Sequence, residues 1–252
     1  MTQPNNLRAT SAALLAGLTF VITGCHQHVQ VAYQPPPPTS NARTPARSTA
    51  SRPYTSTAPT EAEIPEVHGK AAYTEVGVAS WYGVNYNHRN AADGSIYDEN
   101  GLTAAHRTLP MGSLVRVTDI ATGKQVTVRI TDRGPFAPNR VIDLSKGAAL
   151  AIGLYRQGIS KVRIEAVSLP SSDPAGHWCV QTGAFKTEAE ALDLKAALKD
   201  HYRGSRVIEF AGPTGYWVRI DPPLRDLKTA NQISTWIGNP GDQSQAYLVR
   251  TD

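Results

Sequence analysis

The chain has 252 residues, a formal net charge of +4 and an isoelectric point near 9.1. This length allows one or two domains plus tails, and the positive charge fits an anionic partner such as nucleic acid, a membrane surface or a cell-wall polymer. The sequence has no glycine-rich phosphate loop and no paired-cysteine zinc spacing, and neither of its two cysteines has the setting of a nucleophile. It therefore predicts no metal and no organic cofactor.

Residues 1–24 have the features of a secretory signal peptide. Arg8 precedes an apolar segment, 12–22, that is too short to span a bilayer as a helix. The segment runs into Val21-Ile22-Thr23-Gly24-Cys25, which resembles the bacterial lipobox, the signal that directs lipid attachment to a cysteine. This predicts an exported lipoprotein anchored in a bacterial membrane through Cys25. His26 rather than Asp follows, which favours the outer membrane under the enterobacterial sorting rule.

An ordinary secretory cleavage near Cys25 is the alternative, with its thiol free or paired to Cys179, the other cysteine. If Cys25 carries lipid, Cys179 has no partner for an intrachain disulfide, although an exported compartment would permit one. We then expect Cys179 to be buried in a strand.

Residues 25–74 are expected to form a disordered tether. They are rich in Pro, Ser, Thr and Ala, include the run Pro35–Pro38, and have almost no aliphatic clusters to bury. The alternative is a segment that folds against the next domain. An anchor followed by a long tether suits a protein whose working domains act away from the membrane.

Residues 75–169 have the short alternating segments and glycine-rich turns of a small β-barrel. The expected strands are 77–82, 114–118, 126–130 and 162–166. One short helix is expected, with Ser145 as its N-cap and Gly153 beyond its end. The domain is therefore predicted to be mainly β.

Asp132 continues the inward-facing parity of Val126, Val128 and Ile130 at the exit of the third strand. We expect its carboxyl group to emerge partly desolvated at the barrel rim, with Arg129 and Arg133 on the opposite parity. Desolvation without an adjacent cation raises a carboxyl pKa, as a general acid at neutral pH requires. The alternative role for Asp132 is turn capping, because Asp-Arg-Gly-Pro is also good turn chemistry.

Four motifs in this order resemble the rare lipoprotein A (RlpA) family. They are Gly77-Val78-Ala79-Ser80-Trp81-Tyr82-Gly83, Leu102-Thr103-Ala104-Ala105-His106-Arg107-Thr108-Leu109-Pro110, Asp132-Arg133-Gly134-Pro135-Phe136 and Val141-Ile142-Asp143-Leu144-Ser145. The resemblance spans essentially the whole domain and implies a double-psi β-barrel. For active members it implies an endolytic lytic transglycosylase, a lyase that prefers peptidoglycan glycan stripped of peptide stems.

The resemblance also implies site residues. Asp132 matches the family's functional aspartate and is the expected acid and base, while His106 and Asp98 match two further catalytic-site positions. His106 is expected to hydrogen-bond the carboxylate or a sugar oxygen. The expected substrate contacts in this domain are Trp81, Tyr82 and Arg133, the two aromatic rings by stacking on sugar faces.

Ser95 departs from the family pattern. Active relatives carry Glu three residues before the Tyr-Asp aspartate, where this chain has Ser95, and Asp93 is the nearest substitute carboxylate. Serine supplies no carboxylate to stabilise positive charge. Two hypotheses therefore stand for the barrel: a glycan-cleaving lyase, and a barrel that binds glycan without cutting it.

After a linker at 170–176, residues 177–252 alternate strand and helix in a β-α-β-β-α-β order. The expected strands are 177–185, 205–210, 215–220 and 245–250, and the expected helices are 188–199 and 227–237. Thr187 and Glu190 form a capping box for the first helix. This order predicts both helices on one face of a sheet, with the other face open.

The segment Val180-Gln181-Thr182-Gly183-Ala184-Phe185 resembles the opening of SPOR domains, which bind peptidoglycan lacking peptide stems, as found at division septa. Gln181, Trp217 and Arg219 have the parity to face away from the helices and are the expected glycan contacts. The alternatives are a helper domain and an RNA-binding sheet of similar topology.

Charge argues against nucleic acid. Residues 177–252 carry nine Lys or Arg and nine Asp or Glu, a net charge of zero, which is poor for neutralising phosphates. Residues 76–168 carry eleven basic and seven acidic side chains, a net charge of +4. The expected partners are peptidoglycan glycan strands and a membrane. A septal scaffold that binds division-site proteins is the third hypothesis.

Overall fold

The computed structural model describes residues 71–82, 86–170, 175–212, 214–238 and 245–252. Cys25, the predicted signal peptide and nearly all of the predicted tether lie outside these residues, as do 171–174 of the predicted linker. Tyr73 and Thr74, predicted to be tether, belong to the first strand. No helix of the described ranges is long and apolar enough to cross a membrane.

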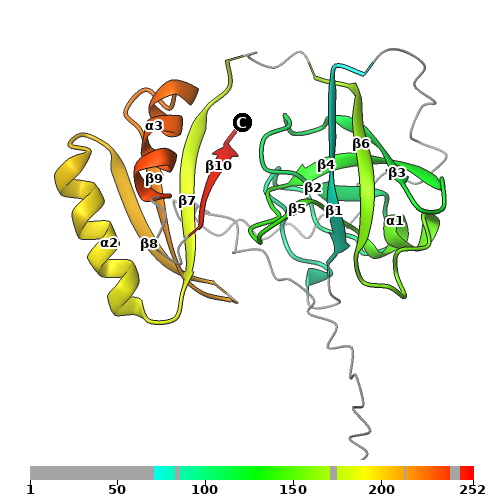
Figure 1. The fold of residues 1–252 in the computed structure, drawn as a ribbon, viewed down its shortest axis with the longest axis horizontal. Coiled ribbons are helices and arrows are strands. Elements are labelled where there is room, and N and C mark those ends of the chain that lie inside the picture. The colour runs from blue at the N-terminus through cyan, green and yellow to red at the C-terminus, as the bar shows by residue number, and fades with distance from the viewer. Residues whose placement is uncertain (1–70, 83–85, 171–174, 213, 239–244) are drawn as a thin grey trace, which may run out of the picture. The chain divides into compact units, whose positions relative to one another are not determined.

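Residues 73–168 form a closed barrel whose strand order is β1-β5-β2-β4-β3-β6 (Figure 1). The strands are β1 (Tyr73–Trp81), β2 (Thr103–Ala105), β3 (Leu114–Asp119), β4 (Gln125–Asp132), β5 (Arg140–Leu144) and β6 (Ser160–Ser168). β1 pairs in parallel with β5 and β2 with β4, and the other pairings are antiparallel. The predicted double-psi β-barrel is confirmed.

The barrel interior is filled by alternating residues of its longer strands. Val126, Val128 and Ile130 of β4 are buried in one apolar cluster with residues of the other strands, as their parity predicted. β2 and β5 were not among the predicted strands. They are only three and five residues long and buried on both faces, so they show no alternation between apolar and polar residues.

Helix α1 (Lys146–Ala151) follows β5 and packs against the loop that precedes β2. The hydroxyl oxygen of Ser145 accepts a hydrogen bond from the backbone N–H of Ala148, which confirms the predicted N-cap. Gly153 follows the helix with a φ of +80°, a conformation that glycine adopts without strain.

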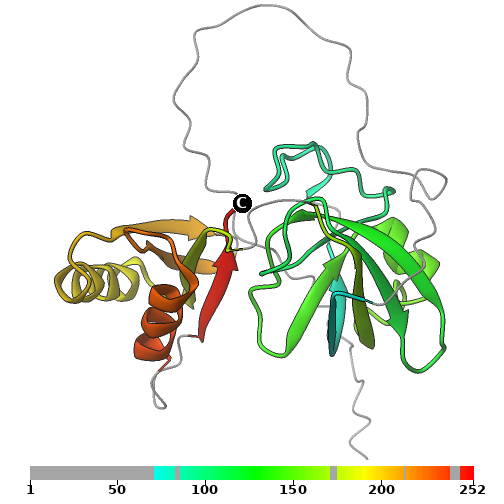
Figure 2. The same ribbon diagram turned by 90° about the horizontal axis from the view of Figure 1, so that it is seen from above.

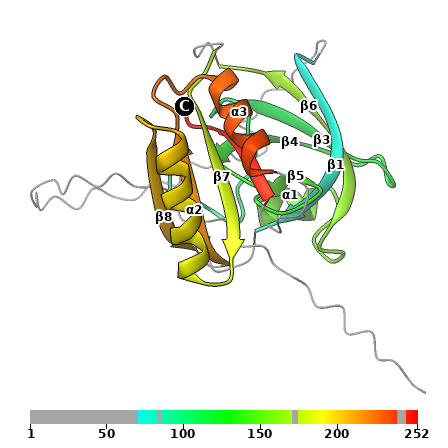
Figure 3. The ribbon, with the colours of Figure 1, turned by 60° about the vertical axis from the view of Figure 1, so that its left-hand side comes forward.

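Residues 178–250 form a four-stranded antiparallel sheet of order β10-β7-β9-β8. Its elements are β7 (Trp178–Phe185), α2 (Glu188–His201), β8 (Arg206–Gly212), β9 (Gly215–Asp221), α3 (Leu227–Ile237) and β10 (Gln245–Arg250). Both helices cover the same face of the sheet (Figures 2 and 3). The predicted order, the helix-covered face and the capping box of Thr187 and Glu190 are confirmed.

The close approach of α1 to the loop before β2 gives a prediction with a definite sign. A Cβ at Gly147 would lie 2.3 Å from the carbonyl oxygen of Asn100. In an unhindered helix Gly→Ala stabilises by about 1 kcal/mol, whereas overpacking costs about 1–3 kcal/mol. We expect Gly147→Ala to lower the free energy of unfolding by about 1–3 kcal/mol in urea denaturation. A higher free energy of unfolding for the variant would show that α1 and this loop do not lie so close together.

Candidate functional site

The pairing of β2 places two carboxyl groups on one face of the barrel wall. β2 is parallel to β4 and antiparallel to β5, so Ala105 is the register partner of Asp132 on one side and Asp143 on the other. Residues paired across neighbouring strands point to the same face, and strands lie about 4.8 Å apart. Asp132 and Asp143 therefore stand on one face, separated by the methyl group of Ala105.

Three hydrogen-bond donors hold the Asp132 carboxylate. Oδ1 accepts hydrogen bonds from the backbone N–H of Arg133 at 2.8 Å and of Ala92 at 3.1 Å, and Oδ2 accepts one from the Tyr82 hydroxyl at 3.3 Å. Burial raises the pKa of Asp132 to about 6, because desolvation outweighs the lowering effect of these bonds. A carboxyl group with this pKa can give and take a proton near neutral pH.

Tyrosine rings surround this part of the rim. Tyr82, Tyr97 and Ala105 form a buried cluster against which Tyr86 packs, and the ring of Tyr82 lies 5.3 Å from that of Tyr97 and 5.9 Å from that of Tyr86. Tyr82 is only 4% exposed, so the predicted stacking of its ring on a sugar is wrong. Burial raises its pKa, as does the Asp132 carboxylate, so its hydroxyl remains a donor.

His106 does not face the Asp132 carboxylate, contrary to expectation. Its Nδ1 accepts hydrogen bonds from the backbone N–H of Thr108 at 3.2 Å and Leu109 at 3.0 Å, which places the ring proton on Nε2, 3.4 Å from Oε2 of Glu75. Burial lowers its pKa although Glu75 opposes this. The side chain is 3% exposed and orders the segment after β2.

Arg133 and Trp81 also have structural contacts rather than open faces. The buried guanidinium of Arg133 donates to the backbone carbonyls of His106 at 3.2 Å and Leu109 at 2.8 Å. The ring of Trp81 lies 4.7 Å from that of Tyr155 and packs against the apolar core of the barrel. The prediction that Arg133 and Trp81 contact substrate has no support in this geometry.

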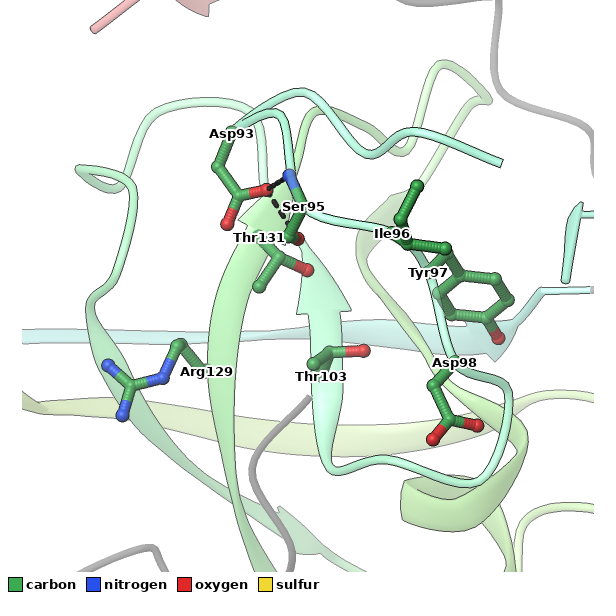
Figure 4. A pocket seen from close by; sticks show the side chains of 8 residues that line it. All are labelled: Asp93, Ser95, Ile96, Tyr97, Asp98, Thr103, Arg129 and Thr131. Carbon is green, nitrogen blue, oxygen red and sulfur yellow. Dashed lines mark hydrogen bonds between the residues drawn. The ribbon is translucent and has the colours of Figure 1, made fainter. Parts of the chain in front are cut away.

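Asp98 lines a pocket of about 150 Å³ on the outer side of β2 and β4, together with Asp93, Ser95, Ile96, Tyr97, Thr103, Arg129 and Thr131 (Figure 4). Its Oδ1 accepts a hydrogen bond from the backbone N–H of Asn100 at 2.9 Å. Oδ1 of Asp93 accepts bonds from both the N–H of Ser95 at 2.8 Å and its hydroxyl at 2.6 Å. Ser95 thus orients the carboxylate of Asp93 within this pocket.

Asp143 is a residue of this rim to which the sequence reasoning assigned no role. It is 1% exposed, and its Oδ1 accepts a hydrogen bond from the Ser80 hydroxyl at 2.5 Å and lies 3.8 Å from Nη1 of Arg140. Burial raises its pKa, although Arg140 and Ser80 oppose this. The available signal was the acidic residue within the otherwise apolar run Val141-Ile142-Asp143-Leu144.

In the second domain, Gln181, Trp217 and Arg219 lie on the sheet face opposite the helices, since their neighbours Val180, Val218 and Ile220 pack under α2 and α3. The indole of Trp217 lies close to β7, since a Cβ at Gly183 would lie 2.8 Å from it. Arg219 forms an ion pair with Asp221 at 2.7 Å. The predicted glycan contacts of this sheet face stay a prediction. Cys179 is buried in β7, as expected.

No group of three or more His, Cys, Asp or Glu side chains that could hold a metal ion occurs within the described ranges. The chemistry of the rim is that of a partly buried carboxyl group with tyrosine and backbone donors. Such a group can transfer protons without a cofactor.

Two family models match this chain. One described as "Lytic transglycolase" matches residues 74–164, and one described as "SPOR domain" matches residues 174–234. The gap between these matches, residues 165–173, overlaps the predicted linker at 170–176 in part.

Relatives with the same printed name occur in several bacteria. "Endolytic peptidoglycan transglycosylase RlpA" of Campylobacter jejuni is 36% identical, over 59% of this chain and 66% of that protein. The protein of that name in Neisseria meningitidis serogroup A is 45% identical, over 48% of this chain and 52% of that protein. The one in Pseudomonas aeruginosa UCBPP-PA14 is 48% identical, over 42% of this chain and 30% of that protein. The chain thus spans less than two thirds of these relatives.

The raised pKa of Asp132 predicts how stability depends on pH. An unfolded aspartate titrates near 3.9, so ionising Asp132 in the folded protein costs stability progressively as the pH rises from about 4 to about 6. Asparagine keeps the shape and carries no charge. We expect Asp132→Asn to exceed the wild type in free energy of unfolding by about 1–3 kcal/mol at pH 7.5, and the difference to vanish at pH 4.

Asp119→Asn is the matched control, measured by the same urea titrations. Burial alone would raise the pKa of Asp119, but hydrogen bonds from Ser160 and Thr122 lower it overall, so this variant should lose stability at pH 7.5. A gain for Asp132→Asn that is the same at both pH values would contradict the raised pKa.

Proposed function

Because the chain belongs to the RlpA family, we propose that it is an endolytic lytic transglycosylase that cleaves peptidoglycan glycan strands poor in peptide stems. The observation that carries this proposal is Asp132, a rim carboxyl group whose pKa is raised to about 6 and whose two oxygens are held by three donors. The lytic transglycolase match over residues 74–164 and the names of the relatives support it.

A single acid and base can perform both steps of this reaction. In the first, Asp132 gives its proton to the oxygen that joins N-acetylmuramic acid to N-acetylglucosamine as the bond from C1 to that oxygen breaks. In the second, the C6 hydroxyl of the same muramic residue attacks C1, and the Asp132 carboxylate takes the hydroxyl proton. The product is a 1,6-anhydro end, the acid is regenerated, and no second carboxylate is required to activate water.

The hydrogen bonds of Asp132 suit both states of the carboxyl group. Oδ1 is held by two backbone N–H groups, so the transferable proton belongs on Oδ2. The Tyr82 hydroxyl donates to that oxygen once the proton has left and stabilises the carboxylate between the two steps.

Cleavage should disappear when Asp132 loses its acid function. We expect the full-length protein, purified in detergent, to release 1,6-anhydromuramic products from denuded peptidoglycan, detected by mass spectrometry. Asp132→Asn should lower the rate at least about 100-fold without loss of sacculus binding. Since the first step requires the protonated acid, the rate should fall as the pH rises above about 6.

Ser95 favours a second candidate, a barrel that binds glycan without cutting it. The family resemblance implies Glu at this position in active members, whereas Ser95 here orients Asp93. In the assay above, wild-type binding to sacculi with no anhydro product would support this candidate. A gain of cutting in Ser95→Glu would then identify the missing carboxylate as the cause.

We further propose that residues 177–252 direct the protein to stem-poor glycan at the division septum, and that Cys25 carries a lipid that anchors the chain in a bacterial membrane. The SPOR match supports the first part and the lipobox-like residues 21–25 support the second. A lipid-anchored chain of this kind would face the periplasm.

Deleting residues 177–252 should abolish septal enrichment in cells while cleavage by the barrel continues. Fluorescence microscopy of tagged full-length and truncated proteins measures the first effect, and the anhydro-product assay measures the second. Unchanged septal enrichment of the truncated protein would exclude this domain as the targeting element.

A further inference from the structure

The pocket beside β2 and β4 has no role in the acid and base chemistry of Asp132. Its walls come from two sources: the loop of residues 93–98, and the outward-facing side chains Thr103 of β2 and Arg129 and Thr131 of β4 (Figure 4). At about 150 Å³ it has room for roughly five water molecules. It can therefore take part of one sugar ring but not a disaccharide.

Thr103 is an unsatisfied polar group in this pocket. Its side chain is 4% exposed, and Oγ1 is buried with no hydrogen-bond partner among the described residues. In Figure 4 its hydroxyl points toward the wall formed by Tyr97 and Asp98. A buried hydroxyl without a partner costs about 1–3 kcal/mol, so such a group at a pocket wall indicates a ligand that completes its hydrogen bonds.

The charges of the pocket disfavour an anionic ligand. The two carboxylates of Asp93 and Asp98 outnumber the one guanidinium, of Arg129, which donates to the backbone carbonyl of Gly112. Carboxylate, guanidinium and hydroxyl groups can all bond the amide and hydroxyl groups of a neutral sugar. Ile96 adds an apolar surface suited to a methyl group.

The pocket wall and the clamp on Asp132 belong to the same loop. The backbone N–H of Ala92 donates to Oδ1 of Asp132, and the next N–H, of Asp93, donates to the carbonyl of Thr131 at 3.1 Å. The bond from the N–H of Ala91 to the carbonyl of Ser95 at 2.7 Å closes the loop. Asp93, which lines the pocket, therefore directly follows Ala92, whose backbone N–H holds the Asp132 carboxylate.

We propose that this pocket holds the acetamido group and an adjoining hydroxyl of one uncharged N-acetylhexosamine unit of the glycan. The Thr103 hydroxyl donates to the acetamido carbonyl, the carboxylates of Asp93 and Asp98 accept from sugar hydroxyls, and Ile96 contacts the acetyl methyl. The inference rests on the proposed glycan substrate, and it adds Thr103 and Asp93 as residues that bind it.

Calorimetric titration of the full-length protein with the tetramer of N-acetylglucosamine tests this assignment, because it measures binding without cleavage. Thr103→Val keeps the shape of the side chain and breaks no internal side-chain hydrogen bond, so its melting temperature should be unchanged or higher. We expect its affinity for the tetramer to fall about three- to tenfold, the loss of one neutral hydrogen bond. The β-1,4-linked tetramer of glucose, which is equally uncharged but lacks the acetamido groups, should bind at least about tenfold more weakly than the acetylated one.

Thr182→Val is the matched control, since Oγ1 of Thr182 is equally buried and without a hydrogen-bond partner, but lies under the helices of the second domain. Its affinity should equal that of the wild type. Equal affinity of Thr103→Val and wild type, or no binding of the acetylated tetramer, would overturn the assignment. If Thr103→Val weakens binding of the tetramer but the wild type releases no anhydro product, the assignment of the pocket stands and the proposed cleavage is rejected.

Discussion

The three-residue strand β2 is the constraint on which the site depends. Because it pairs in parallel with β4 and antiparallel with β5, Ala105 brings Asp132 and Asp143 to one face of the barrel wall. The small side chain of Ala105 packs in one buried cluster with the rings of Tyr82 and Tyr97. The same strand presents Thr103 on the outside, where the pocket lies. Both the acid and the proposed sugar contact therefore depend on one short pairing.

Opposing effects set the protonation of Asp132. Burial among tyrosines disfavours the charged carboxylate, whereas two backbone N–H groups and the Tyr82 hydroxyl stabilise it, and burial prevails, so the pKa of Asp132 is raised to about 6. The loop of residues 91–98 contributes one of these donors and also forms a wall of the pocket. The proposed sugar contact and the acid therefore share this one loop.

Much of this fold and part of the site follow from the sequence. The alternation of Val126, Val128 and Ile130 predicted β4 and placed Asp132 at its exit. The expected inward parity of Asp132 is wrong, because the register shifts after Ala104 and Asp132 pairs with Ala105, on the face opposite to Ile130. β2 and β5 have no such alternation, so their pairing was not predictable, and the one sequence signal for Asp143 was its place in an otherwise apolar run. Parity along one strand also says nothing about partners on other strands. His106 and Tyr82 were therefore assigned as ligand contacts, whereas their contacts are Glu75 and Asp132.

The central claim is that Asp132 titrates near neutral pH. Carbon-13 NMR of the side-chain carboxyl carbon of Asp132, followed from pH 3 to pH 9 and assigned with Asp132→Asn, measures this directly. The account predicts a midpoint near 6. A midpoint at or below the unperturbed value of about 3.9 would mean that the carboxyl group is fully ionised at neutral pH and lacks the proton that the first step requires.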